Sequence, residues 1–236
     1  SAGRLTEQGR RMLAFPLHPR YSRLLLAAQE AGCVRDAALV AALVQGRDLL
    51  LRKVDAAPSE FRERRFEDGA DSDFEVLKRA WEFARQSDYR MEAWQRAGIH
   101  AVTARQVGPL FDQFLEIAAK EGLDVSEKPA PPEALRRCLL IGFSDRVARR
   151  CDEGTLRCEL VHGRTGVLGR ESVVRQSPLF VAAELREVEG RGELTTLLSA
   201  ACGQNMHSTS PHRVDPEGRN LKQRFVTAAR WTIVGH

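Results

Sequence analysis

The first half of the chain places its apolar residues at helical spacing. The run 21–31 follows this period, and Gly32 after it is a residue typical of helix ends. The next run, 34–51, is apolar on nearly every side, which predicts a helix at the centre of a bundle. Pro16 and Pro19 come just before these runs and predict an extended elbow that leads into the first helix.

More helices are expected up to residue 121. Ser72 begins one of them, because Glu75 three residues later completes a capping box. A short helix ends at Gly98, and Thr103 can cap a longer one. Between these helical patterns, the charged run 62–69 predicts an exposed loop.

Beyond residue 121 the period of the pattern changes from helical to alternating. The segment 122–132 contains three prolines and mixed charge, which predicts an extended linker. One helix, 133–143, is expected after it, and short alternating segments follow. The expected strands are 146–151, 156–160, 179–185 and 194–198, with turns at 152–154 and 189–192. Short strands at this spacing favour a small closed or nearly closed barrel.

These patterns predict an α+β protein with an N-terminal helical bundle followed by a small β-barrel. We place the helical domain at residues 1–123 and the linker at 124–132. The barrel with its leading helix is expected at 133–203, and a C-terminal tail with short strands at 204–236. The leading helix is expected to pack on the barrel.

Charge divides the chain unevenly. Residues 1–125 are neutral, so the whole formal net charge of +4 lies in residues 126–236. Only five of the 36 basic residues are lysine. The planar guanidinium of arginine suits phosphate groups, although codon usage can produce the same bias.

Cysteines and apolar runs bear on where the protein works. The five cysteines form no C-x-x-C pair, and an odd number argues against a secreted disulfide framework. No apolar run reaches membrane-spanning length, and no signal peptide is recognisable. We therefore expect a cytoplasmic protein with no membrane partner.

Motifs for catalysis and metal binding are incomplete. There is no G-x-x-x-x-G-K-[ST] loop for a triphosphate and no Asp-Glu-x-His strand for magnesium, so this chain is expected to be no enzyme and to hold no cofactor. Cys202, His207 and His212 lack a fourth zinc ligand. Ser144, Asp145 and His162 are the residue types of a hydrolase triad, but no nucleophile elbow accompanies them. The glycine-rich segment 162–166 is interpreted as a turn.

Motifs in both halves resemble the region that follows the motor in DEAH-box RNA helicases. Leu-Thr-x-x-Gly-Arg-Arg at 5–11 and Phe-Pro-Leu-His-Pro-Arg at 15–20 resemble the helicase-associated region. The pattern from Ser72 to Leu115 resembles its ratchet-like helical domain. Leu-x-Gly-Phe-x-Asp-x-Val-Ala-Arg-Arg at 140–150 and Cys-Glu-Leu-Val-His-Gly-Arg at 158–164 resemble the terminal OB-fold.

Two further segments, 180–185 and 214–219, lean toward the bacterial HrpB-type branch of that family. The resemblance implies a parent ATP-dependent helicase whose RecA-like motor domains use ATP and Mg²⁺. It also implies that this region guides single-stranded RNA, with DNA left open, past those domains. The alternative is a protein-docking module that binds a regulatory partner through the OB-fold.

Basic residues of the barrel are the candidate site in either case. An OB-fold groove lined with guanidinium groups follows a phosphate backbone, whereas a solvated charged face is the structural alternative. The candidate nucleic-acid-binding residues are Arg149, Arg150, Arg157, His162, Arg164 and Arg170. Arg149 and Arg150 point to opposite faces of a regular strand, so at most one of them enters the groove.

Aromatic residues offer little for base stacking. Phe180 is the one candidate on the barrel strands, which predicts weak sequence preference. Trp81 and Trp94 lie at helical spacing, where core packing is the favoured interpretation.

Overall fold

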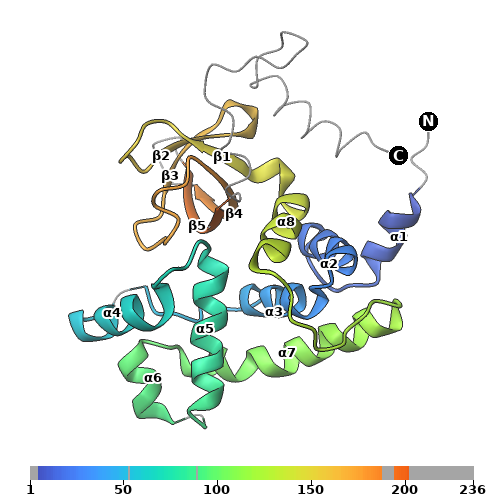
Figure 1. Ribbon diagram of the computed structural model, residues 1–236, viewed down its shortest axis with the longest axis horizontal. Helices are drawn as coiled ribbons and strands as arrows, with labels where there is room; N and C mark the ends of the chain where they lie inside the picture. The colour runs from blue at the N-terminus through green and yellow to red at the C-terminus, as the bar shows by residue number, and fades with distance from the viewer. Residues whose placement is uncertain (1–4, 53, 89, 188–193, 202–236) are drawn as a thin grey trace.

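A computed structural model describes residues 5–52, 54–88, 90–187 and 194–201. Its helices surround one side of a small barrel of strands (Figure 1). Three sequence interpretations lie outside the described residues, namely the turn at 189–192, the histidines and Cys202 considered for zinc, and the tail 204–236.

Eight α-helices and one π-helical turn are described. They are α1 (Glu7–Leu13), α2 (Pro19–Ala31), α3 (Val34–Val44), α4 (Ala56–Arg62), the π-helical turn η1 (Glu63–Glu67), α5 (Asp73–Gln86), α6 (Met91–Ala97), α7 (Ala101–Lys120) and α8 (Pro132–Gly142). Several ends are set locally. Pro19 is the first residue of α2, and Gly32 ends it with a left-handed φ of 67°. The Ser72 hydroxyl accepts a hydrogen bond from the backbone N–H of Phe74 and caps α5.

The helical core is centred on α3, as its apolar sequence predicts. All residues from Ala37 to Leu43 are buried. Trp81 and Trp94 are buried in the same core, so neither side chain is available to stack on a base. Residues 124–131, which form neither helix nor strand, run back along the bundle, where Gln29 and Arg35 bind their backbone at Asp124 and Val125.

Three predictions about the helical half are wrong. The helix expected at 34–51 ends at Val44. His100, and not Thr103, caps α7. The charged run 62–69 is mostly exposed, but it is helical and no loop over most of its length, because α4 ends at Arg62 and η1 follows.

Arg62 is the buried charged residue of this run. Its guanidinium donates to the carbonyl oxygens of Ala97 at 2.8 Å and Leu51 at 2.9 Å, as well as to that of Gly98. A charged side chain that sequence polarity had placed outside therefore joins two backbone segments to α4.

Five strands make up the barrel. They are β1 (Val147–Arg150), β2 (Arg157–Leu160), β3 (Thr165–Leu168), β4 (Leu179–Glu187) and β5 (Leu194–Ala201), with short 3-10 helices η2 (Ser144–Arg146) and η3 (Val161–Gly163). The strand order is β1-β2-β3-β5-β4, and β1 pairs with β4 to close the sheet. All pairs are antiparallel except β3 with β5. Strand β3 was missed because the glycine-rich segment 162–166 was interpreted wholly as a turn.

Alternation along β4 decides which side of the barrel meets the helices. Phe180 and Ala182 point into the barrel core, whereas Val181 and Ala183 belong to the core of the helical bundle. On the opposite side, the outward side chains Arg149, Arg157, Glu159 and Thr165 of β1, β2 and β3 stay exposed. Phe180 is fully buried, so the one aromatic residue expected to stack on bases is unavailable.

The position of helix α8 just before β1 suggested that it packs chiefly on the barrel, but this prediction is wrong. Its main neighbour is α2, and Cys138 and Leu139 are buried in the core of the helical bundle. The Sγ atoms of Cys138 and Cys33 lie 3.7 Å apart in that core. Helix α8 therefore packs as part of the helical bundle, and the chain continues from it through η2 into β1.

Candidate nucleic-acid interface

The outward residues of β1, β2 and β3 form an exposed surface, the outer barrel face, made of Arg149, Arg157, Glu159 and Thr165. Strand register places Arg149 opposite Glu159 and Glu159 opposite Thr165, so these three side chains make one cross-strand row. Arg157 lies one row away, because it is two residues before Glu159. Arg149 donates to the Glu159 carboxylate at 2.6 Å, and both side chains are about half exposed. The face therefore carries two arginines, and the Arg149 guanidinium is paired with a carboxylate on the same face.

Arg150 is not on the surface where sequence analysis placed it. Its side chain is buried, and its guanidinium donates to the backbone carbonyl oxygens of Thr155, Val174 and Ser177. The guanidinium carbon also lies 6.0 Å from the centroid of the Phe180 ring. Arg150 thus ties two loops to the barrel core and has no donor directed at solvent for a phosphate.

Arg164 lies at one end of the barrel, beside Arg146. Ala148 pairs with Leu160, so residues before β1 and residues after β2 meet at the same end of the sheet. The backbone N–H of Leu160 donates to the carbonyl of Arg164 at 2.8 Å, which keeps the intervening turn tight. His162 belongs to that turn, in η3, and its side chain is outside the described part of the structure.

Arg170 lies at the other end. Arg164 precedes β3 and Arg170 follows it, so the length of the strand separates them. The side chain of Arg170 is exposed, and its backbone carbonyl accepts a hydrogen bond from Arg175 at 3.1 Å. The structure therefore groups Arg149 and Arg157 on the outer face, places Arg164 at one end, and leaves Arg170 at the opposite end.

The end that carries Arg164 also adjoins the start of α2. Arg20, from α2, donates to both carboxylate oxygens of Asp145, through Nε at 3.0 Å and through Nη2. Arg146 Nε lies 3.9 Å from the same carboxylate. Arg20 was missing from the predicted site, although the Pro-Arg and Phe-x-Asp motifs that supply this pair had both been recognised in the sequence.

Positive charge exceeds negative charge around Asp145, and this excess shifts the pKa values of nearby groups. Hydrogen bonding to Arg20 lowers the pKa of the Asp145 carboxyl. Burial, followed by the charges of Arg20 and Arg146, lowers the pKa of His18, whose Nε2 is 3.2 Å from Nη1 of Arg20. The imidazole is thereby held in its neutral form, and Asp145 stays ionised.

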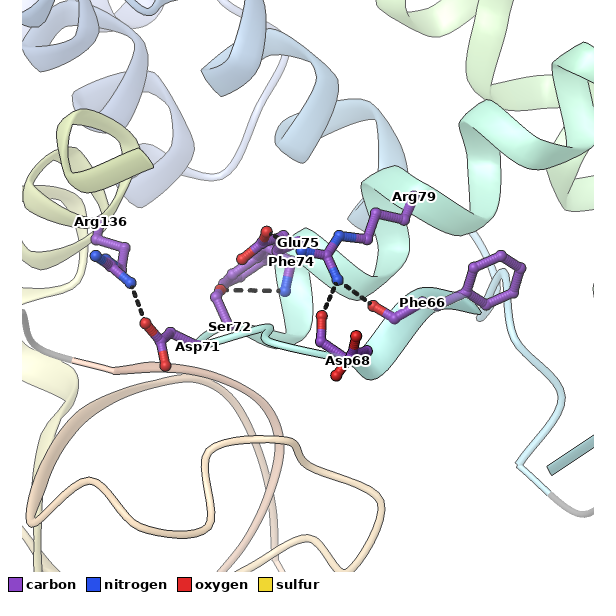
Figure 2. Close-up of polar contacts among 8 residues, drawn as sticks. All are labelled: Phe66, Asp68, Asp71, Ser72, Phe74, Glu75, Arg79 and Arg136. Carbon is purple, nitrogen blue, oxygen red and sulfur yellow. Dashed lines mark hydrogen bonds and ion pairs between the residues drawn. The ribbon is translucent and has the colours of Figure 1, made fainter. Parts of the chain in front are cut away.

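A second joint fastens the barrel to the N-terminus of α5. The buried Asp73 carboxylate accepts hydrogen bonds from the Ser172 hydroxyl, at 2.9 and 3.0 Å, and from the Val173 backbone N–H, at 2.9 Å. Figure 2 shows the neighbouring contact, in which Arg136 of α8 donates to the Asp71 carboxylate at 2.7 Å. The barrel is thus held to the helices at two separate places.

The segment before α5 is itself fixed from one side. Arg79 donates to the backbone carbonyls of Phe66 and Asp68, at 3.0 and 2.7 Å, and pairs with Glu75 (Figure 2). These bonds place Asp71 and Asp73 against α8 and the barrel. They are structural contacts and present no free cation to a ligand.

No cofactor or metal site stands out among the described residues. A cavity of about 470 Å³ lies between the segment after α3 and β4, and its walls include Arg47, Asp48, Glu184 and Arg186. This lining has both signs of charge and favours no ligand of one sign. Among the described residues, no three His, Cys, Asp or Glu side chains gather as they would around a metal ion. Within the same part of the chain, no helix is long and apolar enough to cross a membrane.

Comparison with known proteins identifies relatives of this architecture. Residues 18–94 match the family described as "Helicase associated domain (HA2), ratchet-like". The ATP-dependent RNA helicase HrpA of Escherichia coli (strain K12) is 24% identical over 239 residues, covering 98% of this chain and 18% of that protein. The putative ATP-dependent RNA helicase rha-2 of Caenorhabditis elegans is 25% identical over 230 residues, covering 82% of this chain and 20% of that protein.

A third relative agrees with these. The ATP-dependent RNA helicase HrpA homolog of Haemophilus influenzae is 19% identical and covers 97% of this chain and 17% of that protein. The chain spans about a fifth of the length of the curated relatives it matches. Two of these relatives are HrpA proteins, so the HrpB-type assignment stays a prediction. Residues 18–94 therefore match a helicase-associated, ratchet-like domain, and the chain is homologous over most of its length to HrpA-type ATP-dependent RNA helicases.

Proposed function

We propose that this chain is the accessory region of an ATP-dependent RNA helicase and that it guides a single strand of RNA along its barrel. The observation that carries the proposal is the outer barrel face, which the helices leave uncovered and which presents Arg149 and Arg157. Arg164 continues this positive charge at one end of the face. Guanidinium groups on an uncovered sheet suit a phosphate backbone.

The barrel is proposed to be an OB-fold. Its support is the closed strand order β1-β2-β3-β5-β4, with β3 and β5 parallel. Five-stranded barrels of this kind bind oligonucleotides on the face of their second and third strands. Both of those strands contribute to the outer barrel face.

Binding is expected to be almost independent of base sequence. The described strands contain one aromatic residue, Phe180, and it is buried. Contacts from arginine to phosphate position a strand without reading its bases. A guide past a motor needs this property, because it must accept whichever sequence passes.

ATP and Mg²⁺ belong, in this proposal, to motor domains elsewhere in the parent protein. The relatives are named ATP-dependent RNA helicases, and this chain matches about a fifth of each. The chain by itself has no phosphate-binding loop. We therefore expect it to hydrolyse no ATP, with or without RNA.

Fluorescence anisotropy with labelled single-stranded RNA and DNA, across a salt series, tests the proposal. Both strands should bind, and affinity should fall steeply with salt because counterions are released from phosphates. The R149Q/R157Q double variant should bind more weakly. Arg96, exposed on α6, supplies the matched control R96Q, which should bind like the unaltered chain. Absence of binding at low salt, or an equal loss in R96Q, would overturn the proposal.

The alternative function is docking of a regulatory protein on the same face. The pairing of Arg149 with Glu159 favours it, because a face with both signs of charge suits another protein surface as well as RNA. This function would replace the first if a partner protein bound the chain tightly while oligonucleotides showed no measurable binding.

A further inference from the structure

Two guanidinium groups, those of Arg20 and Arg146, lie at the Asp145 carboxylate where α2 meets the barrel, and the charge of Arg164 acts on Arg146. We call Arg20, Arg146 and Arg164 the arginine cluster. Arg20 engages both oxygens of Asp145, so that carboxylate is already committed to one partner. The second arginine, Arg146, reaches it only at 3.9 Å. Positive charge at this position is therefore only partly compensated.

The remaining two arginines are available to an added anion. The Arg146 side chain is about one quarter exposed. Burial, then the charge of Arg20, lowers the pKa of the Arg146 guanidinium, and the charge of Arg164 acts in the same direction. Arg164 is exposed, and within the described part of the chain its guanidinium has no hydrogen bond or ion pair. An anion between them would relieve this repulsion.

The scaffold beneath the cluster is rigid. A Cβ atom added at Gly142 would lie 2.9 Å from the backbone oxygen of Arg20, so α8 and α2 are in direct backbone contact. The rings of Tyr21 and Phe143 meet edge to face with centroids 5.0 Å apart. These contacts fix Arg20 relative to Arg146. The tight turn after β2 fixes the backbone of Arg164, so binding would cost little backbone conformational entropy there.

We propose that the arginine cluster binds one backbone phosphate of the guided strand between Arg146 and Arg164, with Arg20 holding Asp145 away from that phosphate. Planar guanidinium groups bind phosphate oxygens through paired, charge-assisted hydrogen bonds. The proposal rests on the proposed function, since the phosphate belongs to the strand that the barrel guides. It adds an anchor at the junction of the helices and the barrel, so that a bound strand contacts both.

The test compares pairs of arginine variants in the full chain, with labelled single-stranded RNA and DNA across a salt series. The R146Q/R164Q variant should bind both strands about tenfold more weakly at moderate salt. The slope of log affinity against log salt should become shallower by about 0.7, because the two arginines share one phosphate and each lost phosphate contact removes about 0.7 on a single strand. The R146K/R164K variant keeps both charges and should recover part of the affinity, though without paired hydrogen bonds.

Arg96 again provides the matched control, because it is exposed on α6 in the helical bundle and is not among the candidate binding residues. R96Q should keep the affinity and slope of the unaltered chain, and thermal unfolding should show that every variant folds. Unchanged binding in R146Q/R164Q, together with a loss in R149Q/R157Q, would overturn the cluster while leaving the proposed function in place. No oligonucleotide binding by the unaltered chain would remove both. If R146Q/R164Q lost binding to an acidic peptide but bound RNA and DNA like the unaltered chain, the cluster would belong to a protein partner and the phosphate site would be overturned.

Discussion

Arg20 and Asp145 are 125 positions apart in the chain, yet the guanidinium of one binds both carboxylate oxygens of the other. The pair joins the first residues of α2 to the turn that leads into β1. Both residues belong to segments that resemble known helicase motifs in the sequence. Their contact shows that these two motifs make one joint in the folded chain.

Replacing Asp145 with Asn should weaken this joint in a pH-dependent manner. The folded-state pKa of Asp145 is lowered, chiefly by its hydrogen bond with Arg20, below the ordinary value of 3.8. The group therefore adds stability above pH 3.8, and that stability is lost as the pH falls through the lower folded-state pKa. D145N should be less stable than the unaltered chain at pH 7, and the difference should shrink below pH 4. Urea unfolding at both pH values measures it, and a difference that stays constant would contradict the assignment.

Gly142 and Gly108 should respond oppositely to replacement with alanine. A Cβ at Gly142 would lie 2.9 Å from the Arg20 carbonyl oxygen and 3.2 Å from Leu24 Cβ, so G142A should destabilise the chain by about 1–3 kcal/mol. Gly108 lies inside α7 with nothing within 4 Å of an added Cβ. G108A should stabilise by about 0.5–1 kcal/mol, because alanine favours helix. Chemical denaturation measures both, and equal effects would show that the contact between α2 and α8 is loose.

Arg62 should matter far more than its charged neighbour Arg64. Replacing Arg62 with Leu leaves the buried carbonyls of Leu51, Ala97 and Gly98 without their donor, which should cost about 2–4 kcal/mol. Arg64 follows two residues later, in η1, and its side chain is exposed. R64L should therefore change the free energy of unfolding by less than about 0.5 kcal/mol. A small effect of R62L on the denaturation midpoint would mean that water replaces the guanidinium.

Native thiol labelling should separate the cysteines by burial. Cys151 is exposed, whereas Cys33, Cys138 and Cys158 are buried. Burial raises the pKa of the Cys158 thiol to about 11, which leaves little thiolate at neutral pH. Iodoacetamide should therefore label Cys151 first among these four, as peptide mass mapping would show. Denaturant should make the other three reactive, and rapid native labelling of Cys33 would contradict the packing of α8 on α2.

Element types were largely predictable, because each depends on local periodicity and local caps. The apolar run after Val34, the cap at Ser72 and the alternation around Cys158 each predict the element that forms there. Strand β3 was missed since it is four residues long, starts just after a glycine-rich turn and contains Gly166 itself. Side-chain alternation over so few positions is too weak a signal.

Exposure of charged residues was less predictable. Arg62 and Arg150 look like surface residues in the sequence, and both are buried with their guanidinium groups bound to backbone carbonyls. Those carbonyls come from loops and element ends whose positions depend on packing across the whole chain. The sequence shows that a side chain is charged, but it does not show whether several backbone carbonyls will surround that side chain in the folded protein.

By itself, the sequence determined most of the helices and strands, the excess of positive charge in residues 126–236 and the resemblance to helicase-associated regions. Only the tertiary structure decided which arginines share a surface. Strand register brought Arg149 beside Glu159, and the close packing of α2 with α8 brought Arg20 to Asp145 and Arg146. Periodicity acts over a few residues, whereas the contact of Arg20 with Asp145 requires chain segments 125 positions apart to pack together. The outer barrel face and the arginine cluster are products of that packing.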